Sequence, residues 1–107
     1  HNYVLDPHTA VAWQAAASYR AATDDDTVNI IVSTASPFKF SDSVLAALAG
    51  NESLAGKDEF QLLQELSHLT GWTIPTALAG LARKTVKHQR VCEKAAMAEC
   101  VQQILSK

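Results

Sequence analysis

The expected fold is decided by the stretch Val28-Asn-Ile-Ile-Val-Ser-Thr34, which is rich in β-branched residues and nearly continuous in apolar ones. A run of this kind is typical of a strand that is buried on both faces, as in a parallel sheet. The backbone donors and acceptors of such a strand need neighbours on each side. Elsewhere only residues 85–88, Thr-Val-Lys-His, form a second and weaker strand candidate. We therefore expect the rest of the sheet to lie outside this chain.

A helix is expected on the N-terminal side of this strand. Asp6 is a strong N-cap, and Pro7 suits the first helical position because its missing donor is not needed there. The run from Thr9 to Ala22 is alanine-rich and apolar on almost every side, which predicts burial on several sides. Because a chain of 107 residues can hardly surround such a helix, the pattern also indicates packing partners outside the chain.

The sequence after the strand predicts a loop broken by Pro37 and then several short helices. The expected elements are a helix capped by Ser41 or Asp42 and ending at Ala49, a helix capped by Asp58 with Gln61 in a capping-box arrangement and ended by Gly71, a helix opened by Pro75, and a last helix over about residues 91–105. The second and the last of these helices carry apolar stripes that are expected to pack in a core: Leu62, Leu63, Leu66 and Leu69, and Met97, Val101, Ile104 and Leu105. A strand with helices before and after it is typical of a doubly covered sheet. We therefore expect one α/β unit over residues 1–107, mostly α-helical, with one clear buried strand at about 28–34.

Composition excludes several classes of protein. Hydrophobic residues make up 48% of the chain and the net charge is −2, so a core is expected and no basic surface points to nucleic acid or an anionic membrane. No apolar run is long enough to span a bilayer. We place Cys92 and Cys100 in the last helix, roughly 12 Å apart, which is too far for a disulfide. Reduced thiols and a cytoplasmic location are therefore expected.

Two places could carry chemistry. Ligands of α/β sheets bind outside the carboxyl ends of the strands, which makes the Thr34 hydroxyl a candidate, with Ser33, Ser36 and Lys39 as polar neighbours. The second place is Asp6 to Thr9 at a helix N-terminus, where backbone N–H groups are free and the dipole is positive. On pattern alone, a satisfied turn and an ordinary capped helix with a surface histidine remain open for these two places. The histidines lack metal-ligand spacing, so no metal site is expected.

Two segments together resemble one known family. The segment Tyr3-Val-Leu-Asp-Pro-His-Thr-Ala-Val11 is similar to the YxxDPHTAV segment of threonine synthases, and Ser33-Thr-Ala-Ser-Pro-Phe-Lys-Phe40 is similar to their sTAxPxKF segment. The order of the two segments also matches, as does the gap of a helix plus a strand between them. The resemblance covers nearly the whole chain and corresponds to the C-terminal end of threonine synthases.

The resemblance implies a fold and an activity. Threonine synthases are fold-type II enzymes that use pyridoxal 5'-phosphate (PLP) to convert O-phospho-L-homoserine and water into L-threonine and phosphate. The cofactor forms a Schiff base with a lysine and acts as an electron sink. In this fold type the pyridine nitrogen faces a neutral hydroxyl or thiol, and the matching position in this chain is Thr34.

The resemblance also implies which other residues lie near the cofactor. Asp6, Pro7 and His8 match the helix start beside the cofactor ring, and we expect Thr9 and Lys39 to lie near the active site as well. Lys39 is not expected to be the Schiff-base lysine, because that residue lies far upstream in the family.

Several parts of a complete enzyme are missing from the sequence. The chain lacks the segment of the Schiff-base lysine, a Gly/Ser/Asn-rich loop for the cofactor phosphate and a recognisable set of groups for the substrate phosphate. We therefore expect an inactive C-terminal fragment, with no catalytic residue of its own, whose partner is the N-terminal remainder of the same chain. A related PLP-dependent phospho-lyase and a stand-alone, non-catalytic module remain alternatives. If the fragment exists alone, its strand is expected to pair with a second copy.

Overall fold

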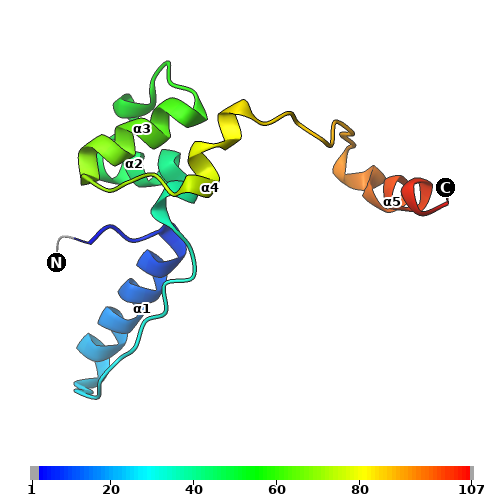
Figure 1. Ribbon diagram of the computed structural model, residues 1–107. Helices are drawn as coiled ribbons and strands as arrows, with labels where there is room; N and C mark the ends of the chain where they lie inside the picture. Colours follow the sequence, from blue (N-terminus) through cyan, green and yellow to red (C-terminus); the bar gives the residue numbers. More distant parts are fainter. Residues whose placement is uncertain (1–2, 107) are drawn as a thin grey trace.

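The computed structural model describes residues 3–106, and every regular element in that range is helical (Figure 1). The α-helices are α1 (Pro7–Thr23), α2 (Ser41–Ala49), α3 (Glu59–Thr70), α4 (Thr76–Ala79) and α5 (Met97–Leu105). Short 3-10 turns lie between them: η1 (Pro37–Phe40), η2 (Asn51–Leu54), η3 (Leu81–Arg83) and η4 (Lys94–Ala96). In Figure 1, α2, α3 and α4 form one group, α1 projects away from it, and α5 lies apart at the end of an extended segment.

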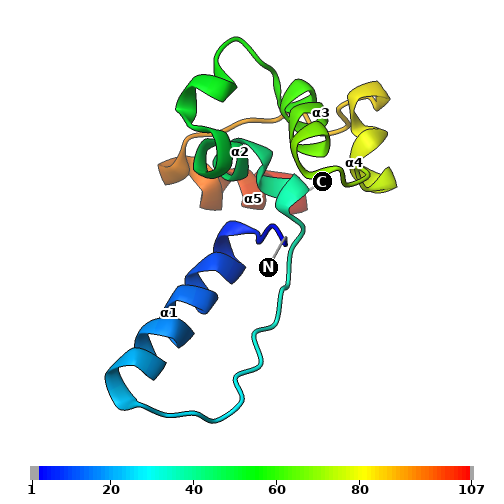
Figure 2. The same cartoon turned by 90° about the vertical axis from the view of Figure 1, so that its left-hand side faces the viewer.

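The expected α/β fold with a buried strand at 28–34 is wrong for residues 3–106. The segment runs back along α1 as a stretched, irregular chain, and no described segment pairs with it (Figure 2). The exposed fractions are 91% for Val28, 87% for Ile30 and 70% for Val32, whereas Ile31 is partly covered. An apolar, β-branched composition favours a strand, but a strand forms only where a neighbour accepts and donates its backbone hydrogen bonds.

Helix α1 and the segment that follows it form a long hairpin. The helix begins after Asp6 and ends at Asp24, which adopts a left-handed conformation with φ of 56°. The turn is fixed at this end because the Tyr19 hydroxyl donates to Asp25 Oδ2 (3.1 Å) and Arg20 Nε donates to the Asp25 carbonyl (3.3 Å). The expected burial of α1 on several sides is wrong, since Thr9 is its only buried residue.

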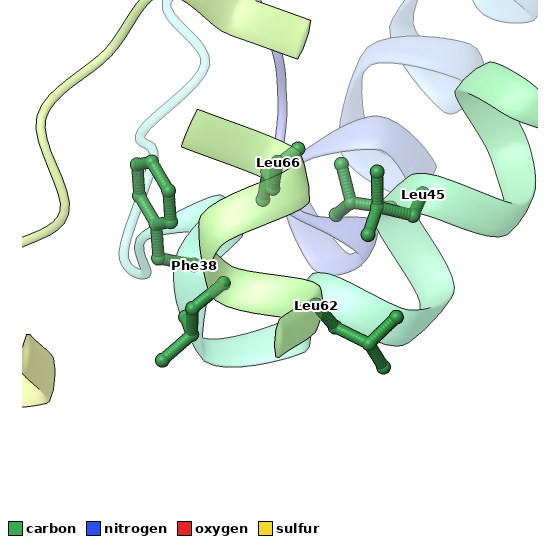
Figure 3. Close-up of a cluster of buried hydrophobic side chains, with 6 residues drawn as sticks. Phe38, Leu45, Leu62 and Leu66 are labelled. Carbon is green, nitrogen blue, oxygen red and sulfur yellow. The ribbon is translucent and has the colours of Figure 1, made fainter. Parts of the chain in front are cut away.

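The hydrophobic core lies between η1, α2 and α3. Six apolar side chains are buried there: Phe38, Val44, Leu45, Leu62, Leu63 and Leu66. Figure 3 labels four of them, Phe38, Leu45, Leu62 and Leu66. Five of the six come from segments that the sequence pattern assigns to helices, whereas Phe38 comes from the segment predicted as a loop. Leu45 and Leu66 are completely covered. Phe38 enters this core from the turn that directly follows Thr34, Ala35 and Ser36. The core therefore anchors one side of the candidate loop.

The predicted ends of α3 are confirmed. Asp58 Oδ1 accepts hydrogen bonds from the backbone N–H groups of Phe60 (2.9 Å) and Gln61 (2.8 Å), and Gln61 Oε1 accepts from Asp58 N–H (2.8 Å). Gly71 ends the helix with φ of 70°, a conformation that favours glycine. These signals are local, which explains why the sequence reveals them.

The predicted cap of α2 is wrong. Neither Ser41 nor Asp42 caps the helix, because η1 runs directly into it and Phe40 occupies the cap position. The capping serine lies one turn earlier, where Ser36 Oγ accepts from the Phe38 N–H (3.3 Å) and begins η1.

The last helix is shorter than predicted, since α5 begins at Met97 rather than near residue 91. Its apolar side chains are exposed, so their expected core role is wrong for the described chain. Cys92 therefore lies outside the helix that carries Cys100, and both are free thiols. Desolvation and the neighbouring Cys100 thiol raise the pKa of Cys92. Among residues 3–106, no helix is both long and apolar enough to cross a membrane.

Candidate functional site

The buried carboxylate of Asp6 joins the start of α1 to segment 28–34, which runs back along α1 and which we call the returning segment. The Asp6 side chain is fully covered, and its Oδ1 accepts from the backbone N–H groups of His8 (3.0 Å) and Thr9 (3.3 Å). Its Oδ2 accepts from the Thr9 hydroxyl and lies 3.5 Å from Ser33 Oγ. Thr9 Oγ1 and Ser33 Oγ are 3.3 Å apart. We call Asp6, Thr9 and Ser33 the Asp6 cluster.

The hydrogen bonds of the cluster favour an ionised Asp6. The Thr9 hydroxyl is the largest cause that lowers the pKa of Asp6, and the N–H groups of Thr9 and His8 add to it, while burial acts in the opposite direction. An ionised carboxylate accepts hydrogen bonds but donates none, so each cluster hydroxyl can direct its single proton toward it. The positive end of the α1 dipole adds to this stabilisation.

His8 lies at the outer side of the cluster. Its ring nitrogen Nδ1 is 3.4 Å from Asp6 Oδ1, and its side chain is 70% exposed. The imidazole ring meets the Phe40 ring edge-on, with 5.1 Å between the ring centroids. The start of α1 is thereby also in contact with η1, which begins just after the loop formed by residues 33–36.

Among the described residues, Thr34 carries the exposed and unpaired hydroxyl of that loop. Ser33 on one side belongs to the Asp6 cluster, and Ser36 on the other side caps η1. Within residues 3–106, the Thr34 side chain makes no hydrogen bond of its own. A hydroxyl held between two anchored serines, but without a partner, is suited to contact a ligand because it can donate or accept.

Lys39 and the Asp6 cluster line different hollows. Lys39 is exposed on η1 and lines a hollow together with Asp42, Glu59 and Leu81. A different hollow, between α1 and the returning segment, is lined by Thr9 and Ser33. The structure thus brings Asp6, His8 and Thr9 together with Ser33, which directly precedes Thr34, whereas Lys39 lines a different hollow.

The contact between Ser33 and Asp6 was not predicted from the sequence, where Ser33 was only a polar neighbour of Thr34. The bond from Ser33 to Asp6 joins residues 27 positions apart in the chain. No local pattern reveals such a contact. The only available signal is that Ser33 is a polar residue directly after the apolar residues 30–32 and is the first residue of the second motif.

Replacing Asp6 with asparagine tests the charge in this cluster. The lowered pKa of Asp6 means that its contribution to stability is fully present above the unfolded-state value of about 3.8 and is lost as pH falls through the folded-state value. We expect amides of the first turn of α1 to exchange faster in Asp6→Asn than in the wild type at neutral pH. The ratio of the two rates should shrink as the pH falls below about 4.

Hydrogen exchange followed by mass spectrometry at several pH values measures this ratio, and the intrinsic pH dependence of exchange cancels in it. Amides of α3 in the same samples serve as the control, and their ratio should stay near one. A ratio for α1 that does not change with pH would contradict the prediction.

Comparison with known proteins gives one match. A family model described as "Threonine synthase, C-terminal" matches residues 9–104, a range that includes Thr9, Thr34 and Lys39 and begins just after Asp6 and His8. Neither the comparison with curated proteins nor the comparison with solved structures gives a match. The match confirms the resemblance drawn from the two motifs. Because it covers nearly the whole sequence, this chain belongs to the threonine synthase C-terminal family.

Proposed function

We propose that this chain is the C-terminal part of a PLP-dependent threonine synthase, which converts O-phospho-L-homoserine and water into L-threonine and phosphate. The family match supports a threonine synthase role, and the proposal extends that role to a cofactor, a substrate and named residues. The observation that carries it is the Thr34 hydroxyl, which is exposed and unpaired among the described residues.

Thr34 suits the ring nitrogen of the cofactor for chemical reasons. Its hydroxyl is neutral, so it can donate to an unprotonated ring nitrogen or accept from a protonated one without imposing a charge. The hydroxyls of Thr9, Ser33 and Ser36 are engaged in the cluster or in the η1 cap. Thr34 is therefore the residue of this region best suited to meet an incoming group.

The cofactor, when bound, supplies an electron sink for carbanion chemistry. The residues of this chain would hold and orient it. Thr34 would contact the ring nitrogen, while Asp6, His8 and Thr9 would form the neighbouring wall at the start of α1. We propose that Lys39 lies near the active site as well, although it lines a different hollow from Thr9 and Ser33.

The isolated chain should be inactive. We propose that the N-terminal remainder of the same protein supplies the Schiff-base lysine and the groups that bind both phosphates. The exposed apolar side chains of α1, of the returning segment and of α5 are consistent with contacts to such a remainder. The free thiols of Cys92 and Cys100 are consistent with a reducing cytoplasm.

The test is an assay of the complete protein against the isolated chain. We expect the complete protein to show the visible absorbance of bound PLP and to release phosphate and threonine from O-phospho-L-homoserine, and residues 1–107 alone to do neither. A complete protein that binds no PLP would contradict the proposal. Bound PLP with phosphate release only from another phosphorylated amino acid would instead indicate a related phospho-lyase.

A further inference from the structure

We propose that Asp6 is a positioning residue that holds the Thr34 loop against the start of α1 through Thr9 and Ser33. The consequence for catalysis rests on the proposed function, because Thr34 is the residue that we place against the cofactor. Its structural part is independent of that function and can be tested without cofactor.

The proton count of the cluster supports a specific arrangement. Ionised Asp6 donates no hydrogen bond, and each hydroxyl has one proton. When Thr9 donates its single proton to Asp6 Oδ2, it cannot also donate to Ser33 Oγ, and Ser33 is left to donate to Asp6 Oδ2. Ser33 Oγ also lies 3.5 Å from the Ala35 carbonyl, a weaker alternative within the loop itself. The loop is thus tied to a buried acceptor that is itself fixed by two backbone N–H groups.

The Asp6 cluster lies directly beside Thr34, so it can fix the direction of the Thr34 side chain. It closes the open end of the α1 hairpin, whose other end is closed by Tyr19, Arg20 and Asp25. Thr34 directly follows Ser33, and its own side chain makes no hydrogen bond within residues 3–106 that would fix it. Its direction therefore depends on Ser33 before it and on the η1 cap at Ser36 after it.

Ser33→Ala in the complete protein removes the hydrogen bond between Ser33 and Asp6. It leaves the cap of α1 intact, because Asp6 still accepts from the backbone N–H groups of His8 and Thr9. Ser18→Ala is the matched control, since Ser18 lies on the exposed side of α1 and accepts only from the Gln14 side chain (3.3 Å). Ser33→Thr keeps the hydroxyl and should behave like the wild type.

The first measurement is amide hydrogen exchange of the cofactor-free protein, followed in peptides that cover Thr34 and Ala35. The loss of one hydrogen bond predicts an increase of roughly fivefold in Ser33→Ala and none in Ser18→Ala or Ser33→Thr. Equal exchange in Ser33→Ala and Ser18→Ala would overturn the inference, whatever the function of the protein.

The second measurement separates the inference from the proposed function. In the cofactor-loaded protein, Ser33→Ala should shift the visible absorbance band in the same direction as Thr34→Ala but by less, and it should lower kcat more than it changes KM. If Thr34→Ala shifts the band and Ser33→Ala does not, the positioning role is refuted and the proposed function stands. If neither variant shifts the band, the role proposed for Thr34 at the ring nitrogen fails, and the exchange result alone decides whether Ser33 is held by Asp6. A protein that shows no band of bound PLP contradicts the proposed function itself.

Discussion

Replacing Leu66 with alanine is expected to accelerate amide exchange throughout α2 and α3 by at least about thirtyfold, which corresponds to a loss of roughly 2–5 kcal/mol for a buried leucine. Leu66 is completely covered and belongs to a core of only six buried apolar side chains, so few neighbours can shift to fill the cavity. Hydrogen exchange of the complete protein measures the effect directly in the two helices.

Leu69→Ala provides the matched control for this prediction. It makes the same chemical change on the same helix, but Leu69 is 52% exposed. We expect a change within about 0.5 kcal/mol, the usual range for surface positions. Equal acceleration in both variants would show that burial in this core does not decide the stability of α3.

Sequence signals that act over one helical turn correctly gave the start of α1 and both ends of α3, although the cap predicted for α2 was wrong. Asp6 and Pro7 begin α1, and Asp58 with Gln61 begins α3, because these side chains satisfy N–H groups only two or three residues away. Gly71 ends α3 for an equally local reason. The apolar stripe predicted for this helix was Leu62, Leu63, Leu66 and Leu69; the first three are buried, whereas Leu69 is 52% exposed.

Signals that depend on distant partners gave wrong predictions. The apolar run at 28–34 expresses a preference for burial, yet Val28 and Ile30 are almost fully exposed because no described segment covers them. The stripe of α5 is exposed for the same reason. An apolar composition shows that a segment is more stable when it is buried. Whether it is buried depends on other segments that cover it, and these lie outside the local sequence.

The candidate site follows the same division. The start of α1 could be predicted from Asp6 to Thr9, since a helix cap is local. The hydrogen bond from Ser33 to Asp6 could not be predicted, because it joins the two ends of the hairpin and depends on how the returning segment lies along α1. The importance of Thr34 came from the resemblance of its segment to a family motif. The structure adds that the Thr34 hydroxyl is free among the described residues.

Thr34→Ala in the complete enzyme is expected to weaken PLP binding or to lower kcat by roughly twofold to tenfold. A hydrogen bond between uncharged groups is worth about 0.5–1.5 kcal/mol, and each 1.4 kcal/mol corresponds to a factor of about ten. The fold should survive, because the side chain is exposed and bonds to no other described residue. Steady-state kinetics and titration of the apoenzyme with PLP measure the two effects.

Thr34→Ser distinguishes the loss of the hydroxyl from a general disturbance of the loop. Serine keeps the hydroxyl and loses only an exposed methyl group, so turnover and the absorbance of bound PLP should stay close to those of the wild type. Amide exchange in α2 and α3 should be unchanged in both variants, since the core behind η1 does not include Thr34. Unchanged turnover and an unchanged cofactor spectrum in Thr34→Ala would mean that the ring nitrogen has another partner, and Thr34 would lose the role that its free hydroxyl supports.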